Sequence, residues 1–402
     1  MAIKQIYLLL SLFIEIFNSK VVRYIYNVND YGYHLYITLG TPCDAAIFAI
    51  NLLTNYSYIT PLNYNRTNSS SVKSFGVKSS PLKLKQKNIS CELLQETIEL
   101  VISMNNDILI DDMYFYYFNY TFVNKNTLTF AHIIPDTNFS ILHNLYNRKR
   151  IDKLQFALFK TEEERGYFYF GGVPDNIIAN LSNATITIEK DSKTWNAPLN
   201  KMIIGDKEFN NKYPMRFETN ERKILFPHEM FVYLQDNIFN EYVKNKSCTF
   251  KQDNNVYECI GEHTKFFPNI DFIISNIKFP LNGENLYKKN FDVLTYQLSE
   301  NLNGDEIIIG VPFFDKYPVL FDYENSLITF YGNSSFQLIE EVKQSNGITW
   351  KVLEDVKYGI ITVVLLFGIG IIIGICHKKE EWIKKIKKEK EENNRDILLQ
   401  DI

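Results

Sequence analysis

The amino-acid sequence predicts a mainly β protein with two packed lobes, followed by one transmembrane helix. Short runs of β-branched and aromatic residues, broken by Asn, Asp, Gly and Pro, recur from about residue 21 to residue 332, and this spacing is typical of strands joined in hairpins. The chain has 402 residues, which is enough for two lobes with a core each. Its composition, 46% hydrophobic and 15% aromatic, favours strands over helices and argues against global disorder.

Two segments have the pattern of helices. One covers residues 140–154 and the other residues 227–245. In the second, Phe231 and Leu234 contribute to an apolar helical face, and Pro227 stands where a first turn begins. We therefore expect one helix among the strands of each lobe.

Segments near the two ends of the chain are typical of a secreted, membrane-anchored protein. Residues 1–20 contain a basic Lys4 and then an apolar stretch, which is typical of a secretory signal peptide, with an uncleaved anchor as the alternative. Tyr358 to Cys376 is a run of 19 residues without a charge, enough for roughly 28 Å of helix. Lysines cluster directly after it, so the tail is expected in the cytoplasm and the ectodomain outside the cell or in the lumen of the secretory pathway. The sequence thus predicts a single-pass type I protein with a signal peptide at 1–20, a stalk at 333–356, a transmembrane helix at 357–376 and a cytoplasmic tail at 377–402.

Cysteines and glycosylation sequons fit this placement. Cys248 and Cys259 flank a short polar loop and would close a hairpin disulfide, which leaves Cys43 and Cys91 to pair with each other. Ten Asn-x-Ser/Thr sequons lie between the signal peptide and the apolar span. They are at Asn55, Asn65, Asn68, Asn88, Asn119, Asn138, Asn180, Asn183, Asn245 and Asn333.

Other classes of function have little support in the sequence. A formal net charge of −4 gives no reason to expect nucleic acid as a partner. The six histidines are scattered without metal-ligand spacing, and the chain has neither a GxSxG elbow nor a phosphate loop. We therefore expect no metal and no cofactor.

Six segments, in order, are similar to parts of the membrane-anchored pepsin-like aspartic proteases. They are "YGYHLYITLGTP", "ISCELLQETIELV", "GYFYFGGVPDN", "TWNAPLNKMIIGDKEF", "FPNIDFIISNIKFPLNGENL" and "IIIGVPFFDKYPVLFDYENSLITFYG". The resemblance covers about residues 29–332. It implies two β lobes, residues 21–187 and 188–332, related by a pseudo-twofold axis, with a cleft between them that holds a peptide or protein ligand.

The family's chemistry needs two aspartates, one from each lobe, about 3 Å apart and sharing a proton. In the family each stands in an Asp-Thr-Gly loop, where the glycine permits a tight turn and the threonine knits the two loops together. The resemblance places Asn51 at the first aspartate position, with Leu52 and Leu53 where Thr and Gly belong. An amide cannot take a proton from water.

The second lobe departs at the matching loop. In "MRFETNERKILFP" Glu218 stands for the aspartate, Thr219 is retained and Asn220 replaces the glycine. Leu84 falls at the position of the flap tyrosine. Asp136, in "PDTNFS", begins the triplet that is most similar to Asp-Thr-Gly. We expect it to serve in a turn or helix cap.

Three functional hypotheses follow from the resemblance. The favoured one is a catalytically inactive homologue whose ectodomain binds a peptide or protein. The second is a divergent, active aspartic-type endopeptidase in which Glu218 activates water, and the third is a structural or adhesive surface glycoprotein that makes no use of the cleft.

Overall fold

The structure is a computed structural model that describes residues 20–339 apart from short internal gaps. The gaps are residues 30–31, 42–43, 62–63, 65, 85–86, 101–107, 119–125, 163–164, 211–212 and 261–266. The described residues belong to one compact unit. Among them, no helix has the length and apolar character needed to cross a bilayer. The expected transmembrane helix at 357–376, the tail and nearly all of the signal peptide lie outside the described residues.

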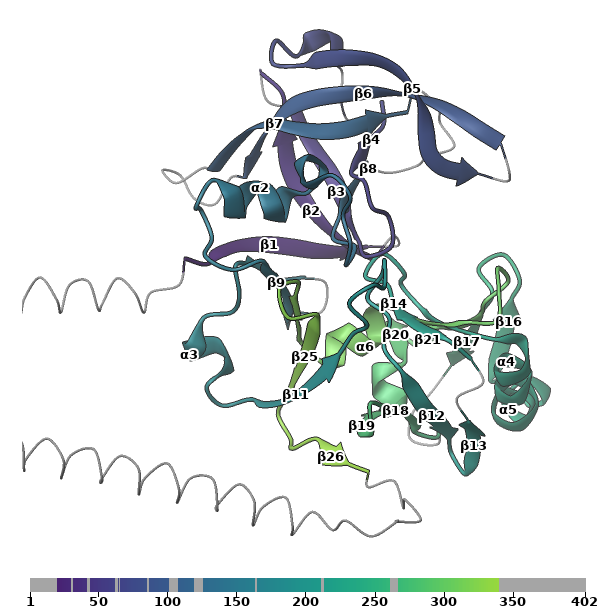
Figure 1. Cartoon of the computed structure of the whole chain (residues 1–402). Coiled ribbons are helices and arrows are strands. Elements are labelled where there is room, and N and C mark those ends of the chain that lie inside the picture. Colours follow the sequence, from purple (N-terminus) through teal and green to yellow (C-terminus); the bar gives the residue numbers. More distant parts are fainter. Residues whose placement is uncertain are drawn as a thin grey trace, which may run out of the picture. The chain divides into compact units, whose positions relative to one another are not determined.

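Strands dominate the first lobe (Figure 1). They are β1 (Val22–Asn29), β2 (Gly32–Leu39), β3 (Asp44–Asn51), β4 (Tyr58–Ile59), β5 (Lys73–Leu84), β6 (Lys87–Leu100), β7 (Ile108–Tyr117), β8 (Asn126–Thr129), β9 (Gln155–Glu162), β10 (Arg165–Phe170) and β11 (Ser182–Thr187). The helical elements are η1 (Arg66–Asn68), η2 (Thr137–Phe139), α2 (Ile141–Asn147) and α3 (Asp175–Ile178).

The second lobe is also built mainly from strands. They are β12 (Leu199–Ile204), β13 (Lys207–Asn210), β14 (Met215–Phe217), β15 (Ile224–Phe226), β16 (Cys248–Lys251), β17 (Val256–Ile260), β18 (Ile270–Ile274), β19 (Ile277–Leu281), β20 (Tyr287–Asn290), β21 (Val293–Tyr296), β22 (Leu298–Glu300), β23 (Ile307–Ile309), β24 (Val319–Asp322), β25 (Leu327–Gly332) and β26 (Gln337–Leu338). The helical elements are α4 (His228–Leu234), η3 (Gln235–Phe239), α5 (Asn240–Lys244), η5 (Gly283–Asn285) and α6 (Val311–Lys316).

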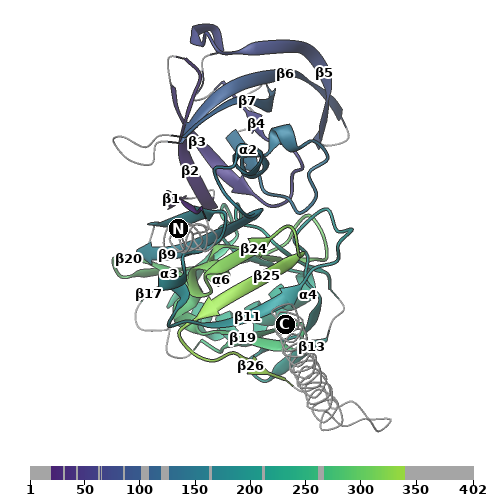
Figure 2. The ribbon, with the colours of Figure 1, turned by 60° about the vertical axis from the view of Figure 1, so that its left-hand side comes forward.

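One sheet combines strands of the first lobe with β24 and β25 of the second. Among the described residues it has 13 strands, in the order β11-β25-β24-β9-β10-β1-β2-β3-β8-β4-β7-β6-β5. Figure 2 shows β24, β25 and β11 side by side. Under this sheet Phe156 stacks on Phe321 with ring centroids 4.6 Å apart, and the buried Trp195 donates its indole N–H to the Phe130 carbonyl at 2.7 Å. The two lobes therefore share apolar core as well as strands.

Each lobe repeats one four-strand motif. In the first lobe β3 pairs with β8 in parallel, β8 with β4 antiparallel, and β4 with β7 in parallel. In the second lobe β14, β23, β15 and β22 pair in the same sequence of directions. Asn51 ends β3 and Glu218 directly follows β14. The expected site residues thus stand at corresponding places in the repeated motif.

The helices agree only in part with the sequence prediction. From His228 to Lys244 the chain is continuously helical, with a π-helical turn at its centre, close to the range expected. The first predicted helix is shorter, because α2 ends at Asn147 and Lys149 has a φ of 55° that no α-helix accepts. Helix α6 was not predicted, since "VPFF" reads as an apolar strand; Pro312 in its first turn favours the helical start.

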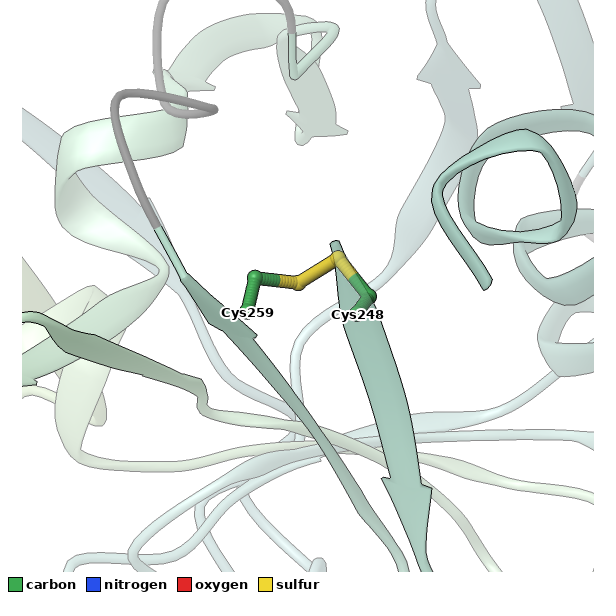
Figure 3. Close-up of a disulfide and its surroundings, with 2 residues drawn as sticks. All are labelled: Cys248 and Cys259. Atoms are coloured by element: carbon green, nitrogen blue, oxygen red, sulfur yellow. A yellow bond between two sulfur atoms is a disulfide. The ribbon is translucent and has the colours of Figure 1, made fainter. Parts of the chain in front are cut away.

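Cys248 and Cys259 form a disulfide across the β16–β17 hairpin, which is the pairing that the sequence favours (Figure 3). The two residues are direct partners in the strand register. Cys43 lies outside the described residues, so its pairing with Cys91 stays a prediction. Cys91 itself is buried, with its Sγ 3.7 Å from the Lys78 carbonyl.

The sequons that the structure describes differ in exposure. Asn55 is half-buried, Asn65 and Asn119 lie outside the described residues, and Asn88 is in β6. The exposed ones are Asn68, Asn138, Asn180, Asn183, Asn245 and Asn333. Glycan attachment at any of them stays a prediction.

Replacing both Cys248 and Cys259 by Ala should lower the free energy of unfolding by about 2–3 kcal/mol, because a short closed loop no longer restricts the unfolded chain. Denaturant unfolding of the full chain in detergent measures the change. A reducing agent should destabilise the wild type by about 2–3 kcal/mol more than the double variant, in which only the predicted Cys43–Cys91 pair is left to reduce. An unfolding midpoint that is the same in both proteins would contradict the prediction.

Candidate functional site

Hydrogen bonds between the lobes hold together the loops that follow β3 and β14. Thr219 Oγ1 donates to the Ile50 carbonyl at 2.8 Å, and the Tyr33 N–H donates to the Thr219 carbonyl at 2.9 Å. Gly32 permits this close approach: it has a φ of +81°, and a Cβ there would lie 2.4 Å from the Thr219 carbonyl oxygen. The structure therefore brings the two candidate loops together.

Asn51 caps the turn of its own loop. Its side chain is buried, and its Oδ1 accepts hydrogen bonds from the Leu53 N–H at 2.8 Å, the Thr54 N–H at 2.7 Å and the Thr54 hydroxyl at 3.1 Å. An amide oxygen accepts such bonds as a carboxylate does, so the turn persists without a charge. The residue keeps the loop's geometry and provides no base.

Glu218 is buried too, and it is ionisable. Its Oε1 accepts from the Asn220 N–H at 3.1 Å, while its own N–H donates to the Ile309 carbonyl at 2.9 Å. Burial raises the pKa of Tyr58 of β4, against an opposing hydrogen bond with Thr127, and the proximity of Glu218 raises it further. Tyr58 was not predicted as part of the site, because only the pairing of β4 with β8 brings it there.

The two loops are built differently at one matched position. The strand registers make Thr129 of β8 the counterpart of Gly310 after β23. A Cβ at Gly310 would lie 2.1 Å from the Lys223 carbonyl oxygen and 2.4 Å from that of Glu221. In the first lobe, Thr129 has its side chain there and donates its hydroxyl to the Thr54 carbonyl. The loop of the first lobe therefore accommodates the Thr129 side chain, whereas the loop of the second lobe has no space for a side chain at Gly310.

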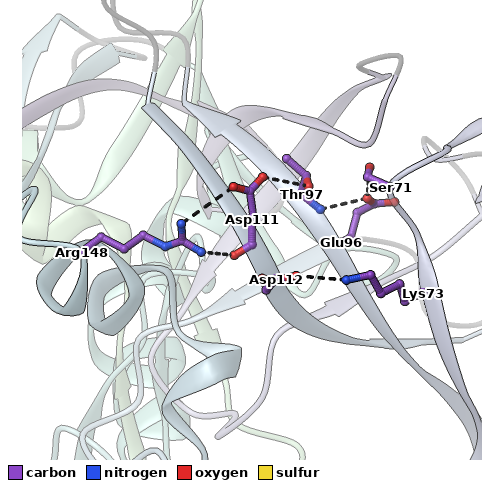
Figure 4. A network of polar contacts seen from close by, with 7 residues as sticks. All are labelled: Ser71, Lys73, Glu96, Thr97, Asp111, Asp112 and Arg148. Atoms are coloured by element: carbon purple, nitrogen blue, oxygen red, sulfur yellow. Dashed lines mark hydrogen bonds and ion pairs between the residues drawn. The ribbon is translucent and has the colours of Figure 1, made fainter.

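A polar network anchors the sheet that carries the β5–β6 hairpin (Figure 4). Asp111 of β7 accepts from the Thr97 hydroxyl of β6 at 3.3 Å and forms an ion pair with Arg148, which follows α2. The buried Glu96 accepts from the Thr97 N–H at 2.8 Å and from the Ser71 hydroxyl. From the sequence resemblance Leu84 is expected at the position of the flap tyrosine, and in the structure it is the last residue of β5.

Asp136 is a helix cap and not a third acid of the site. It is the N-cap residue of η2, and its side chain accepts from the Asn138 N–H at 3.0 Å. The expectation that "PDTN" forms a turn or cap is confirmed.

Comparisons with known proteins agree with this geometry. The profile of the family described as eukaryotic aspartyl protease matches residues 63–331, which is more than half of the chain. The chain therefore belongs to the eukaryotic aspartyl protease family. Among solved structures it is similar to basic 7S globulin from soybean, with a TM-score of 0.60 and 12% sequence identity over 79% of this chain and 98% of that one, a likeness that shows the fold. No curated protein matches.

Thr219→Val should lower the free energy of unfolding by about 1–3 kcal/mol, because the buried Ile50 carbonyl loses its donor while the side chain keeps its shape. Chemical denaturation of the full chain measures this loss. Thr187→Val, at an exposed position on β11 that belongs to no sequon, is the matched control and should change stability by less than about 0.5 kcal/mol. Equal effects of the two variants would show that the link between the loops contributes little.

A second prediction concerns His34, which is buried on β2 beside this link. Burial lowers its pKa, against a smaller opposing effect of the Gly32 carbonyl that accepts from its Nδ1 at 3.4 Å. Because the unfolded state takes up the proton first, stability should be lost as the pH falls below about 6.5, the ordinary value, towards the lower folded pKa. His34→Gln should reduce this slope in unfolding midpoints measured from pH 7.5 to 5. Part of the slope should remain, since burial also lowers the pKa of His143. An unchanged slope would contradict the prediction.

Proposed function

We propose that this chain is a catalytically inactive member of the aspartic protease family, and that its ectodomain binds a peptide or protein segment between the lobes. The observation that carries the proposal is Asn51. Its Oδ1 is committed to three hydrogen bonds within the loop, and an amide has no titratable proton in the working range of the family's chemistry. The general base is therefore missing from the first lobe.

Glu218 alone does not replace the pair. The family's mechanism depends on two carboxylates that share one proton, so that one acts as base while the other polarises the carbonyl. Glu218 is also one methylene longer than aspartate, and roughly 1 Å of misplacement can cost about a hundredfold in rate. In the family a second carboxylate accompanies this one. Among the described residues, Asn51 stands at its matched position.

Binding remains supported where catalysis is not. The repeated strand motif, the bond between Thr219 and Ile50 and the hairpin of β5 and β6 are all retained. A chain with no use for the region between the lobes would have no evident reason to keep two buried polar loops in close contact there, because buried polar groups weaken a fold unless they are satisfied. These features favour a ligand-binding role over a purely structural one.

We further propose that the protein is a single-pass type I membrane glycoprotein. The support is the charge-free run from Tyr358 to Cys376, the lysines that follow it, and the sequons upstream. The disulfide between Cys248 and Cys259 fits an oxidising compartment.

The proposal predicts that the full chain, purified in detergent, cleaves no member of a random peptide library between pH 3 and pH 7. An active member of the family, run in parallel, shows that the assay detects cleavage. Mass spectrometry of the library before and after incubation is the measurement. Cleavage that pepstatin inhibits and that Glu218→Ala abolishes would overturn the proposal and establish the divergent protease instead.

A further inference from the structure

The hairpin of β5 and β6, with the loop before it, carries a concentration of positive charge. Between positions 66 and 91 the sequence has six basic residues and no acidic one, although the whole chain has a formal net charge of −4. Most of them belong to the two strands, and Lys85 lies outside the described residues. The six are Arg66, Lys73, Lys78, Lys83, Lys85 and Lys87.

Acidic neighbours offset only part of this charge. Arg66 forms an ion pair with Glu92 of β6. Lys73 Nζ lies 3.5 Å from Asp112 Oδ1 at an exposed place on the sheet (Figure 4). Lys78 is exposed as well, and none of the ion pairs among the described residues involves it. Two of the six basic residues are therefore paired with a carboxylate.

The far end of the hairpin has no carboxylate opposite its lysines. In the strand register Lys83 pairs with Asn88, and Lys87 pairs with Leu84. β5 is also the last strand in the order of the 13-stranded sheet, so no described strand flanks its outer side (Figure 2). The formal charge along this open edge of the sheet is therefore positive.

The edge does not suit an added β-strand as its partner. Pro81 lacks the N–H that a strand ladder requires, and Gly76 has a φ of +80°. The pairing of β5 with β6 also shifts register in two places. Proline, lysine and irregular pairing are features that keep edge strands from joining other strands. A partner at this edge is therefore recognised through side-chain charge.

The spacing of the lysines fits a linear anionic polymer. Lys73, Lys78 and Lys83 recur every five residues in β5, so they are spread over about 30 Å of extended chain. A small anion could contact only one of these positions at a time, whereas a polymer with an anionic group on each unit can contact them all. A lysine ammonium is a hydrated point charge that needs no fixed geometry from its anion, and this suits a flexible polymer.

We propose that the β5–β6 hairpin binds a sulfated polysaccharide. The turn of the hairpin has the sequence Leu84-Lys85-Gln86-Lys87, and such charged residues are costly to insert into a bilayer. An ectodomain outside the cell meets polysaccharides rather than nucleic acids. The inference goes beyond the proposed function, since it uses the proposed membrane topology and makes no use of the region between the lobes.

The test uses the full chain in detergent and immobilised heparin as the probe. We expect the protein to be retained at about 0.1 M NaCl and to elute as the salt concentration rises, because salt screens exposed charges. Immobilised polyglutamate is the comparison, and we expect it to release the protein at lower salt, since it carries carboxylates and no sulfates. Equal retention on both matrices, or no retention on heparin, would overturn the proposal.

The combined variant Lys78→Gln, Lys83→Gln and Lys87→Gln should bind heparin about a hundredfold more weakly, at about fivefold for each lysine near an anionic surface. The same three positions changed to Arg keep their charge and should bind as the wild type does. Three exposed lysines of the second lobe, changed to Gln together, are the matched control with the same change in net charge. They are Lys190, Lys244 and Lys289.

The control variant should bind heparin within about twofold of the wild type, because its lysines lie on other elements and isolated surface charges contribute little. Equal weakening of the two triple variants would show that binding follows net charge alone, and it would overturn the assignment to the hairpin. Heparin binding and peptide binding are measured separately, so either proposal can fail while the other stands.

Discussion

The hydrogen bond from the Thr219 hydroxyl to the Ile50 carbonyl is the contact on which the arrangement of the candidate site depends. Thr219 is wholly buried, so its hydroxyl must find an acceptor inside the protein, and the acceptor belongs to the other lobe. The Tyr33 N–H completes the link at the Thr219 carbonyl, where only a glycine at position 32 leaves enough space. Leu52 follows Asn51 as Thr219 follows Glu218, and a leucine has no hydroxyl with which to form the reciprocal bond. Leu52 is fully buried, so that side of the contact is apolar packing.

Under the proposed function, this link explains how the fold accommodates Asn51 and Glu218 at the two matched positions. A buried carboxylate is unfavourable unless it is paired or hydrogen-bonded, and two close together are worse. Asn51 keeps the acceptor that the turn needs and removes one of the two charges. Glu218 then lies in a site where it has no second carboxylate at position 51 to repel it. If the proposed function is correct, an Asn in place of an Asp at this point lowers the electrostatic cost of the loop and removes the shared proton together.

Much of the fold could be predicted from local patterns. Alternating β-branched and aromatic runs indicated the strands, the apolar face after Pro227 indicated the long helix, and the spacing of Cys248 and Cys259 indicated their disulfide. Helix α6 was missed because four apolar residues have no period that separates a strand from a short helix. Tyr58 and Thr129 were missed for another reason: their roles depend on parallel and antiparallel pairing among β3, β8 and β4, which no local pattern encodes.

The sequence by itself determined that position 51 carries a side chain without a titratable group. Whether position 51 can accept a proton is a property of the side chain, and Asn51 settles it in any environment. Only the tertiary structure decided which groups meet: that Thr219 bonds to Ile50 across the lobes, and that Thr129 occupies the place of a glycine. The physical reason is that these contacts join segments far apart in the chain. Their partners are selected by strand pairing and by burial in the common core, not by the residues next to them in sequence.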